Sequence, residues 1–344
     1  MPVLENVLVE KQKNSVLLKT TDLETSMVER LPVRMETKMG LSDSIADTDT
    51  AVLPLKKIAN TVENMGDIPV EIVVDDEQDI RLETEKGTYE MKGDNPDDFP
   101  DFPKIDTGNR MSTAGLKAAL NKVGFAVSND ALRPAMQGVF MDAEQDVVVA
   151  TDGHRLSKVE FEVPLSDSVI LMEEGVSIMT RVMDDESTLF VGEDKDYALL
   201  KNGNTKVFSR LVEESYPDYE AVIPKENDLE MVVDRDMLSS SVERTSIYTD
   251  GEMSEAVQLN IESDQVQVIG QDIERSAQGE ETIPCEFNGD EPMTIAFNGG
   301  YLKELLKVFD AEEVKFSLDS PNNAGIVEPI GEEGHTALLM PVIV

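Results

Sequence analysis

The sequence has no tryptophan and very little cysteine or histidine, and these scarcities exclude several classes of protein. Cys285 is its one cysteine, so no internal disulfide or thiolate metal cluster can form, as is typical of a cytoplasmic protein. The two histidines, His154 and His335, lie far apart along the chain, which argues against a histidine-rich metal site. The sequence therefore predicts a protein without a metal ion or another cofactor.

Long apolar runs are also missing. No stretch of a dozen residues is free of charged side chains, and residues 1–13 do not begin with a basic segment followed by an apolar one. We therefore expect neither a membrane span nor a signal peptide, and no membrane among the partners.

Basic residues are few: the sequence contains 30 Lys and Arg but 70 Asp and Glu, which gives a formal net charge of −40. A charge of this size and sign repels phosphate backbones and anionic lipid, so it argues against unassisted binding to either. Hydrophobic residues still make up 40% of the chain, enough for a folded core. Because the acid is spread along the whole sequence, we expect a halophilic acidic protein with a surface adapted to high salt.

The sequence does contain a pattern that recurs about every 120 residues, the length of whole domains rather than of solenoid repeats. Two alternating apolar segments joined by a short polar turn, typical of a β-hairpin, occur three times, and an aspartate ends each of them. The hairpins lie at 7–18, 139–149 and 257–269, and their aspartates are Asp22, Asp152 and Asp272.

Helical patterns accompany each hairpin. One helix follows the hairpin, at 53–65, 173–183 and 298–309, and a second opens the next unit, at 111–126 and 234–248. Similar turns, Phe99-Pro100-Asp101-Phe102-Pro103 and Tyr216-Pro217-Asp218-Tyr219, close the first two units. Short strands with two helices per unit predict an α+β fold of antiparallel sheets in three repeated domains, 1–104, 105–226 and 227–344.

The first unit is shorter than the others at its start. Asp22 lies much nearer to the beginning of its unit than Asp152 or Asp272 does, so about one helix is missing and the first domain is incomplete. We expect the hairpin from Val3 to Leu18 and the helix at 53–65 to lack a packing partner, and an upstream extension to complete this domain.

The five helical segments carry about as many basic as acidic residues, so nearly all of the excess acid lies outside them. Two explanations stay open. Lysines can keep such helices soluble, or the helices can line a surface that faces a polyanion while the sheets face solvent.

Four short segments carry a resemblance to a known family. They are Thr151-Asp152-Gly153-His154-Arg155-Leu156; Tyr216-Pro217-Asp218-Tyr219 continuing to Val222-Ile223-Pro224; Phe297-Asn298 with Tyr301-Leu302; and the terminal Met340-Pro341-Val342. In these segments, and in their order along the entire chain, the sequence resembles the bacterial DNA polymerase III β subunits, the sliding clamps. It looks like an acidic member that is shortened at the N-terminus.

The resemblance implies the DNA clamp fold, in which two subunits close head to tail into a ring with sheets outside and helices inside. Such a ring has no enzymatic activity. It would encircle double-stranded DNA non-specifically and tether the DNA polymerase III catalytic subunit, the clamp loader and other proteins with clamp-binding peptides. The DNA-facing residues would be Lys56, Lys57, Lys117, Lys122, Arg181, Arg244, Lys303 and Lys307.

Two protein-binding surfaces are implied as well. A pocket between the second and third domains receives short linear peptides in the family, and apolar side chains with a few polar groups suit an extended peptide. The matching positions are Met136, Thr151, Gly153, His154, Arg155, Leu156, Pro217, Val222, Leu338, Met340, Pro341 and Val342. The dimer interface would join Tyr89 and Met91 to Ile247 and Tyr248 of the other copy.

Other interpretations compete with the clamp. Asp152 and His154 could act in general base catalysis, but Asp-Gly after a strand is a turn signal and no nucleophile with a recognisable motif accompanies them. Asp47-Thr48-Asp49 has Val52 where a calcium loop has glycine, which predicts a polar turn. The remaining alternative is an acidic scaffold that binds proteins and never encircles DNA.

The charge predicts how stability responds to salt. At −40 per chain, self-repulsion opposes the compact state, and at 1 M salt the screening length falls to about 3 Å. We therefore expect the melting temperature, measured by circular dichroism, to rise as the salt concentration is increased to about 1 M. A melting temperature that stays flat or falls would show that the acidic side chains are paired locally.

Overall fold

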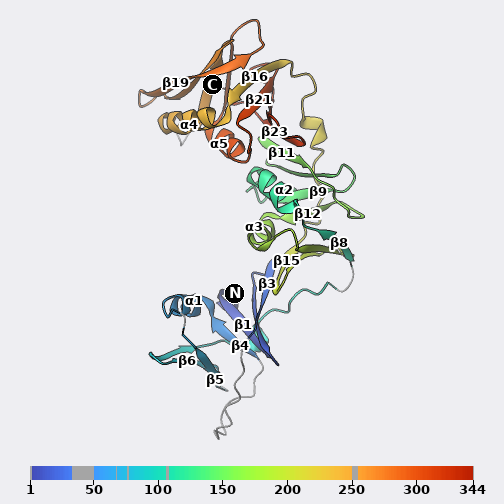
Figure 1. Ribbon diagram of the computed structural model, residues 1–344, viewed down its shortest axis with the longest axis vertical. Coiled ribbons are helices and arrows are strands. Elements are labelled where there is room, and N and C mark those ends of the chain that lie inside the picture. The colour runs from blue at the N-terminus through green and yellow to red at the C-terminus, as the bar shows by residue number, and fades with distance from the viewer. Residues whose placement is uncertain are drawn as a thin grey trace. The chain divides into compact units, whose positions relative to one another are not determined.

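The computed structural model describes residues 2–32, 50–66, 68–75, 77–105, 108–249 and 255–343 (Figure 1). Contacts divide the chain into two compact units, Met1–Ala114 with Ser177–Leu211, and Gly115–Val176 with Val212–Val344. Both units draw on the predicted second domain, because its strands pair with the first repeat in one unit and with the third repeat in the other.

The first unit contains an eight-stranded antiparallel sheet in the order β4-β1-β2-β3-β15-β14-β13-β8 and a three-stranded sheet in the order β5-β6-β7. The larger sheet consists of β1 (Asn6–Gln12), β2 (Ser15–Thr21), β3 (Thr25–Pro32), β4 (Thr50–Pro54), β8 (Gly108–Ser112), β13 (Thr188–Gly192), β14 (Tyr197–Asn202) and β15 (Thr205–Arg210). The smaller consists of β5 (Glu71–Val74), β6 (Asp79–Thr84) and β7 (Gly87–Lys92). Val7, Leu53 and Ile80 form a core between the two sheets.

The second unit contains a twelve-stranded antiparallel sheet in the order β12-β9-β10-β11-β23-β22-β21-β16-β19-β18-β17-β20. Its strands are β9 (Gly138–Asp142), β10 (Val147–Thr151), β11 (Arg155–Glu160), β12 (Val169–Met172), β16 (Leu229–Asp234), β17 (Ala256–Ile261), β18 (Gln265–Asp272), β19 (Ala277–Phe287), β20 (Met293–Asn298), β21 (Glu313–Leu318), β22 (Gly325–Pro329) and β23 (His335–Leu339). Its largest core is lined by Leu238, Phe297, Phe309 and Phe316, so helix and sheet bury their apolar faces together.

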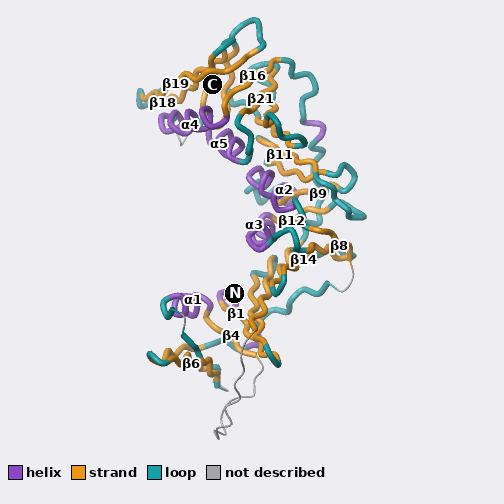
Figure 2. Tube along the Cα trace, viewed as in Figure 1, coloured by secondary structure: helices purple, strands orange, loops and turns teal. Residues whose placement is uncertain are grey.

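Five α-helices and several 3₁₀ turns complete the described part of the chain. The helices are α1 (Leu55–Glu63), α2 (Leu116–Val123), α3 (Glu173–Val182), α4 (Arg235–Thr245) and α5 (Gly299–Lys307). The 3₁₀ turns are η1 (Pro2–Glu5), η2 (Pro96–Asp98), η3 (Gly124–Ala126), η4 (Pro134–Gln137), η5 (Glu220–Val222) and η6 (Ser246–Tyr248). In the second unit, α2, α4 and α5 lie along one side of the strands (Figure 2).

The helix predicted over 111–126 is wrong at its start. Met111 belongs to β8, where it pairs with Leu189, and the helix begins only at Leu116. Gly115 has φ +77°, a left-handed conformation that suits glycine and separates the strand from the helix. The start predicted at 53 is also too early, because Leu53 pairs with Val7 in β4 and the helix begins at Leu55. The starts predicted at Asp234 and Asn298 are confirmed, because each of these side chains accepts a hydrogen bond from a backbone N–H in the first turn.

The predicted α+β fold is confirmed, and strand order supports the threefold repeat. Four strands recur in the same order in each repeat: β4-β1-β2-β3, β12-β9-β10-β11 and β20-β17-β18-β19. The recurring aspartates have one structural role, since each side chain accepts backbone N–H groups of the turn after its hairpin. Asp22 accepts from Thr25 N, Asp152 from Arg155 N and Asp272 from Arg275 N.

None of the described helices is long and apolar enough to cross a membrane. Within the same described ranges, no three His, Cys, Asp or Glu side chains gather as they would around a metal ion. Asp47 and Asp49, where we expected a polar turn, lie outside the described residues.

The second and third repeats join where β11 pairs with β23, and a histidine is buried at this joint. His335 begins β23 opposite Val159 and is 3% exposed. Its Nε2 lies 3.0 Å from the hydroxyl of Ser157, which donates to the carbonyl of Lys122, while its Nδ1 has no hydrogen-bond partner. Burial, with the nearby Lys122 ammonium adding to it, lowers the pKa of His335 from 6.5 to about 4.

This lowered pKa predicts a pH dependence of stability. The imidazole is neutral in the folded protein and gains a proton more readily when unfolded, so its contribution is present above pH 6.5 and is lost as the pH falls toward 4. We expect the free energy of unfolding of the natural protein to fall relative to His335→Gln by up to about 3 kcal/mol over that range.

Urea unfolding at pH 7 and pH 4.5 measures this difference, and the comparison with a variant removes the response of the many carboxylates. His154→Gln is the matched control, because His154 is exposed and should leave the pH dependence unchanged. A parallel decline of the natural protein and His335→Gln would contradict the assignment.

Candidate functional site

A tight turn between β10 and β11 presents the segment that carries the resemblance. Asp152 accepts hydrogen bonds from the backbone N–H groups of His154 at 2.8 Å and Arg155 at 2.9 Å, and Thr151 donates its hydroxyl to the carbonyl of Arg155. Gly153 has φ +88°, and a Cβ there would come within 3.1 Å of the Arg133 guanidinium. The turn therefore requires a short acceptor followed by glycine, which explains Thr-Asp-Gly.

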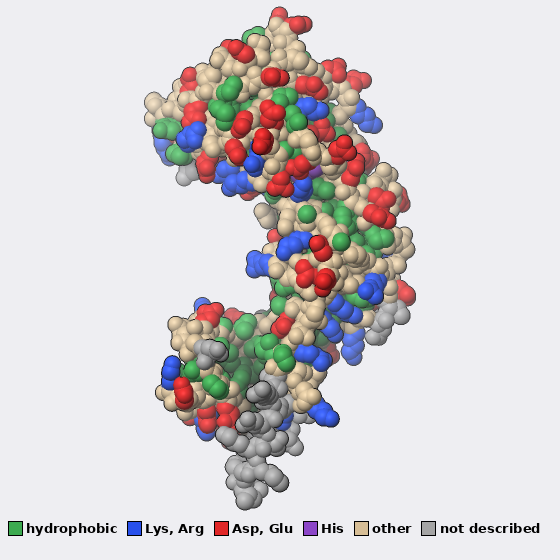
Figure 3. Space-filling view, viewed as in Figure 1, with side chains coloured by type: hydrophobic (Ala, Val, Ile, Leu, Met, Phe, Trp, Pro, Cys, Tyr) green, Lys and Arg blue, Asp and Glu red, His purple; other side chains and the backbone are tan. Residues whose placement is uncertain are grey.

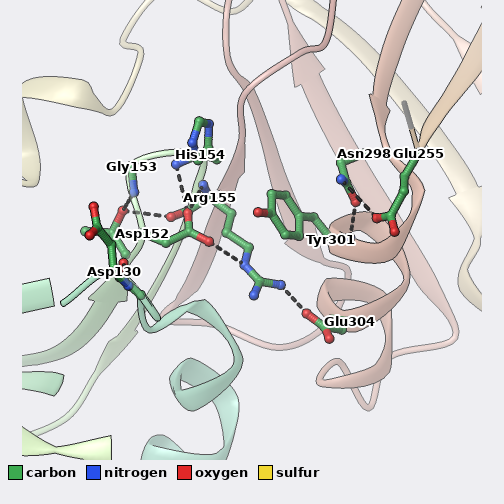
Figure 4. Close-up of polar contacts among 11 residues, drawn as sticks. Asp130, Asp152, Gly153, His154, Arg155, Glu255, Asn298, Tyr301 and Glu304 are labelled. Atoms are coloured by element: carbon green, nitrogen blue, oxygen red, sulfur yellow. Dashed lines mark hydrogen bonds and ion pairs between the residues drawn. The ribbon is translucent and has the colours of Figure 1, made fainter. Parts of the chain in front are cut away.

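Arg155 is a buried cation, and Figure 4 shows it between the carboxylates of Asp152 and Glu304 and the ring of Tyr301. Its Nε donates to Asp152 at 3.1 Å, and its Nη1 donates to Glu304 of α5. Its guanidinium lies 4.2 Å from the ring centroid of Tyr301 and 5.3 Å from that of Phe125. These partners compensate the cost of burying the charge, so Arg155 ties the turn of the second repeat to a helix of the third.

The C-terminal segment lies against the same turn. Leu338 of β23 pairs with Leu156 of β11, and the backbone N–H of Met340 donates to the carbonyl of His154 at 2.8 Å. The chain then crosses to β20. There Pro341 forms an isolated antiparallel β-bridge with Phe297, and the backbone N–H of Val342 donates to the carbonyl of Ala296. Residues 340–342 are therefore held by backbone hydrogen bonds to β20 and to the turn at His154.

An apolar cluster lies behind these segments. Leu156 and Leu338 pack with Tyr219, and Phe140 stacks on Tyr216 with ring centroids 4.6 Å apart. The hydroxyl of Tyr219 donates to Asp142 at 2.8 Å. Burial, together with the Asp142 carboxylate, raises the pKa of Tyr219, so this hydroxyl stays protonated and anchors the turn that contains Pro217.

The structure brings most of the predicted peptide-binding positions together. Thr151, Gly153, His154, Arg155 and Leu156 form the turn and the start of β11, and Leu338, Met340, Pro341 and Val342 lie beside them. Met136 lies near Gly153, since a Cβ there would be 3.8 Å from its methyl carbon. Pro217 and Val222 flank Tyr219 of the apolar cluster; Val222 and Met340 are 56% and 43% exposed.

Four residues around this site were not predicted from the sequence, namely Phe125, Arg133, Tyr301 and Glu304. Tyr301 was noted for the resemblance, but its contact with Arg155 depends on the packing of α5. Asn298 caps α5 by accepting from the backbone N–H of Tyr301 at 2.9 Å, which fixes the start of the helix and so places Glu304 one turn later (Figure 4).

The predicted DNA-facing cations differ in whether a carboxylate already holds them. Arg244 donates two hydrogen bonds of 2.6 Å to Glu281, which lowers the pKa of that carboxyl to about 2, and Lys122 forms an ion pair of 2.7 Å with Glu332. Lys56, Lys57, Arg181, Lys303 and Lys307 form no ion pair with any described residue, and Lys117 has other contacts. Lys and Arg side chains gather over α4 and α5 in Figure 3.

The predicted interface residues are surface residues of their units. Tyr89 of β7 is 40% exposed, whereas Met91 is half-buried against the core of its unit. Ile247 is 76% exposed, and the ring of Tyr248 lies against Gly279 of β19, where a Cβ would come within 2.5 Å of it. Ile273, 81% exposed at the end of the third hairpin, is a further apolar surface residue that we had not predicted.

Comparisons with known families agree with this geometry. A family model described as "DNA polymerase III beta subunit, central domain" matches residues 110–218, and one described as "DNA polymerase III beta subunit, C-terminal domain" matches residues 220–343. Together the two models match more than half of the chain, and they meet beside Tyr219.

Individual relatives match nearly the whole chain. A beta sliding clamp of Synechococcus elongatus is 28% identical, and one of Staphylococcus aureus is 23% identical; each match covers 99% of this chain and 92% of the relative. The sliding clamp of Bartonella birtlesii, solved with griselimycin bound, is 26% identical to this chain with a TM-score of 0.86. The match covers 100% of this chain and 92% of the Bartonella birtlesii chain. The clamp of Pseudomonas aeruginosa has the same TM-score at 24% identity, with 100% and 93% covered.

Proposed function

Because the chain belongs to the family of DNA polymerase III β subunits, the sliding clamps, we propose that two copies close head to tail into a ring around double-stranded DNA. A DNA sliding clamp is a non-enzymatic processivity factor of DNA replication. We further propose a cytoplasmic protein of three domains, 1–104, 105–226 and 227–344, whose partners are the polymerase III catalytic subunit, the clamp loader and other proteins with clamp-binding peptides.

The observation that carries the ring is the way the sheets continue from one repeat to the next. Each repeat has four strands in the order of β4-β1-β2-β3, and the last of these four pairs antiparallel with the final strand of the following repeat. In this way β3 pairs with β15, and β11 pairs with β23. The same rule would join β19 of the third repeat to β7 of the first repeat in a second copy.

Both strands offer the edge that this pairing needs. β7 is the edge strand of its three-stranded sheet. Among the described strands, β16 pairs with β19 only from Cys285 to Phe287, so the first half of β19 keeps one edge open. Tyr89 on β7 and Tyr248 against β19 would then meet across the contact, with Met91 and Ile247 beside them.

The charges suit a ring that holds DNA by topology. A ring that encloses its DNA needs only weak phosphate contacts, and strong ones would slow sliding. Arg244 and Lys122 already have carboxylate partners, so we assign most of the DNA contact to Lys56, Lys57, Arg181, Lys303 and Lys307. The abundant acid elsewhere supports a halophilic protein, for which high salt screens the repulsion between protein and DNA.

Encirclement predicts a dependence on DNA ends. Protein loaded by a clamp loader onto nicked circular DNA should remain bound through gel filtration, and cutting the circle once should release it. Tyr89→Asp should prevent retention, because it places a charge in the proposed interface, while Ile330→Asp, at a surface position 42% exposed outside the proposed interface, should be retained.

The same experiment separates the clamp from the acidic scaffold. A scaffold that binds only proteins never associates with the circle. Retention that survives linearisation would also contradict encirclement, because it would show direct binding to the duplex.

The turn after β10 and the C-terminal segment suggest where client peptides bind. We propose that they lie along Gly153, His154 and Met340, with Leu156, Leu338 and the tyrosine cluster beneath them and Arg155 holding the turn in place. Methionines suit a site with several clients because their side chains repack easily. Griselimycin, which is bound to the Bartonella birtlesii clamp, is a second candidate ligand for this site.

The peptide site can be tested without disturbing the buried Arg155. The double variant Val222→Asp with Met340→Asp changes two exposed side chains, so the fold should persist while affinity for a polymerase tail peptide falls about 100-fold. That loss corresponds to about 1.5 kcal/mol for each apolar contact. Isothermal titration calorimetry measures it, and Met237→Asp, at a position also 43% exposed, is the matched control. Unchanged affinity in the double variant would exclude this site.

A further inference from the structure

One face of the eight-stranded sheet of the first unit carries basic side chains and no acidic ones over β8, β13, β14 and β15. Side chains alternate between the two faces of a sheet, and Leu189, Leu200 and Val207 point to the face that is buried. The alternate positions form the other face, which we call the cationic face. Its residues are Gly108, Arg110, Ser112, Thr188, Phe190, Gly192, Tyr197, Leu199, Lys201, Lys206, Phe208 and Arg210. Four of them are basic and none is acidic, although the whole chain has 70 acidic residues against 30 basic ones.

Strand pairing gathers these cations around an aromatic ring. The ammonium of Lys201 lies 4.1 Å from the ring centroid of Phe190. Arg110 pairs with Phe190 across the strands, and its guanidinium lies 5.8 Å from the same centroid. Lys206 lies directly opposite Lys201, and Arg210 follows on the same face of β15. Lys and Arg side chains gather beside β8 in Figure 3, so the face presents a compact group of positive charge.

The chain does not neutralise this charge itself. Like charges directly opposite each other on neighbouring strands destabilise a sheet, as Lys201 and Lys206 do here. None of the four cations forms an ion pair with any described residue. By contrast, Lys19 in β2 of the same sheet forms an ion pair with Glu10 of β1. Because a local rule of sheet stability is broken where acidic residues are otherwise abundant, the cationic face is suited to an anion from outside the chain.

We propose that the cationic face binds a short acidic segment of a partner protein. Its Asp and Glu side chains would form charge-assisted hydrogen bonds with Arg110, Lys201, Lys206 and Arg210. The charge complementarity of the face supports this occupant, since Arg110, Lys206 and Arg210 are exposed.

Two features favour a short peptide over a nucleic acid. Single-stranded nucleic acid binds to rings on which its bases can stack, whereas the ring of Phe190 already has two cations beside it. Acidic turns at 184–186 and 193–196 also lie at the two ends of β13. These turns repel a long polyanion but leave room for a short segment between them.

A fluorescein-labelled hexaglutamate peptide is the probe, titrated with the full chain and followed by fluorescence anisotropy. At about 0.15 M salt the screening length is about 8 Å, which weakens repulsion from the distant acidic surface more than it weakens direct ion pairs. The peptide should bind saturably, and Lys206→Glu with Arg210→Glu should weaken binding at least tenfold. Lys56→Glu with Lys57→Glu is the matched control, because it makes the same charge change at two exposed positions of α1 and should leave binding unchanged.

A stability measurement separates a binding role from a structural one. Lys206→Glu places a carboxylate opposite Lys201, so this single variant should keep or raise the melting temperature while it weakens binding of the peptide. A lower melting temperature would show that Lys206 serves the fold, and would overturn the proposal.

The titration has two further outcomes that would overturn the proposal. One is the absence of saturable binding, or equal weakening by the two double variants. The other is saturable binding of a labelled oligothymidylate, but not of hexaglutamate, that Lys206→Glu with Arg210→Glu removes, because it would identify single-stranded nucleic acid as the ligand. None of these measurements requires ring closure or duplex DNA, so a failure here is distinct from a failure of the clamp function.

Discussion

The pairing of strand edges between repeats is the constraint on which the rest of this structure depends. An unpaired sheet edge exposes a row of backbone donors and acceptors, and the first and second repeats satisfy that row with a strand of the next repeat, β15 and β23. At the joint of the second and third repeats, β11 pairs with β23 over five residue pairs. This pairing places the turn at Gly153 next to the C-terminal segment at Met340, and so brings together the two distant parts of the chain that form the proposed peptide site.

Arg155 reinforces that joint by electrostatics. A buried guanidinium is stable only if its charge is compensated, and here Asp152 comes from its own turn while Glu304 and Tyr301 come from α5. The cation consequently serves as a structural link between two repeats. His335, buried beside Ser157 in the same joint, contributes to the stability of the fold only while its imidazole is neutral.

Local pairing also distinguishes the basic residues that we propose to face DNA. Arg244 and Lys122 are each held by a glutamate, while the lysines of α1 and α5 form no ion pair with the part of the chain that is described. An overall charge of −40 therefore coexists with a small number of cations on the helices. Weak contacts of this kind are compatible with a protein that stays on DNA because it surrounds it.

The sequence by itself determined the repeat and much of the local structure. Alternating apolar residues gave the three hairpins, and the aspartates after them were recognisable because a turn needs a short side-chain acceptor. The helix starts at Asp234 and Asn298 were predictable for the same reason, as local caps. The start of the second helix was not, because Met111 pairs with Leu189 of β13, a partner that lies far away in the sequence.

The tertiary structure alone decided which side chains meet. The segment from Thr151 to Leu156 was identified as a binding element, but nothing local to it indicates that Glu304 and Phe125 enclose Arg155. In the same way, Lys122 and Glu332 are 210 residues apart, so their ion pair follows from the β11–β23 joint. Periodicity and turn chemistry act over a few residues and are readable in order along the chain. Burial and charge pairing depend on strands and helices that the fold brings together, and the sequence does not display those neighbours.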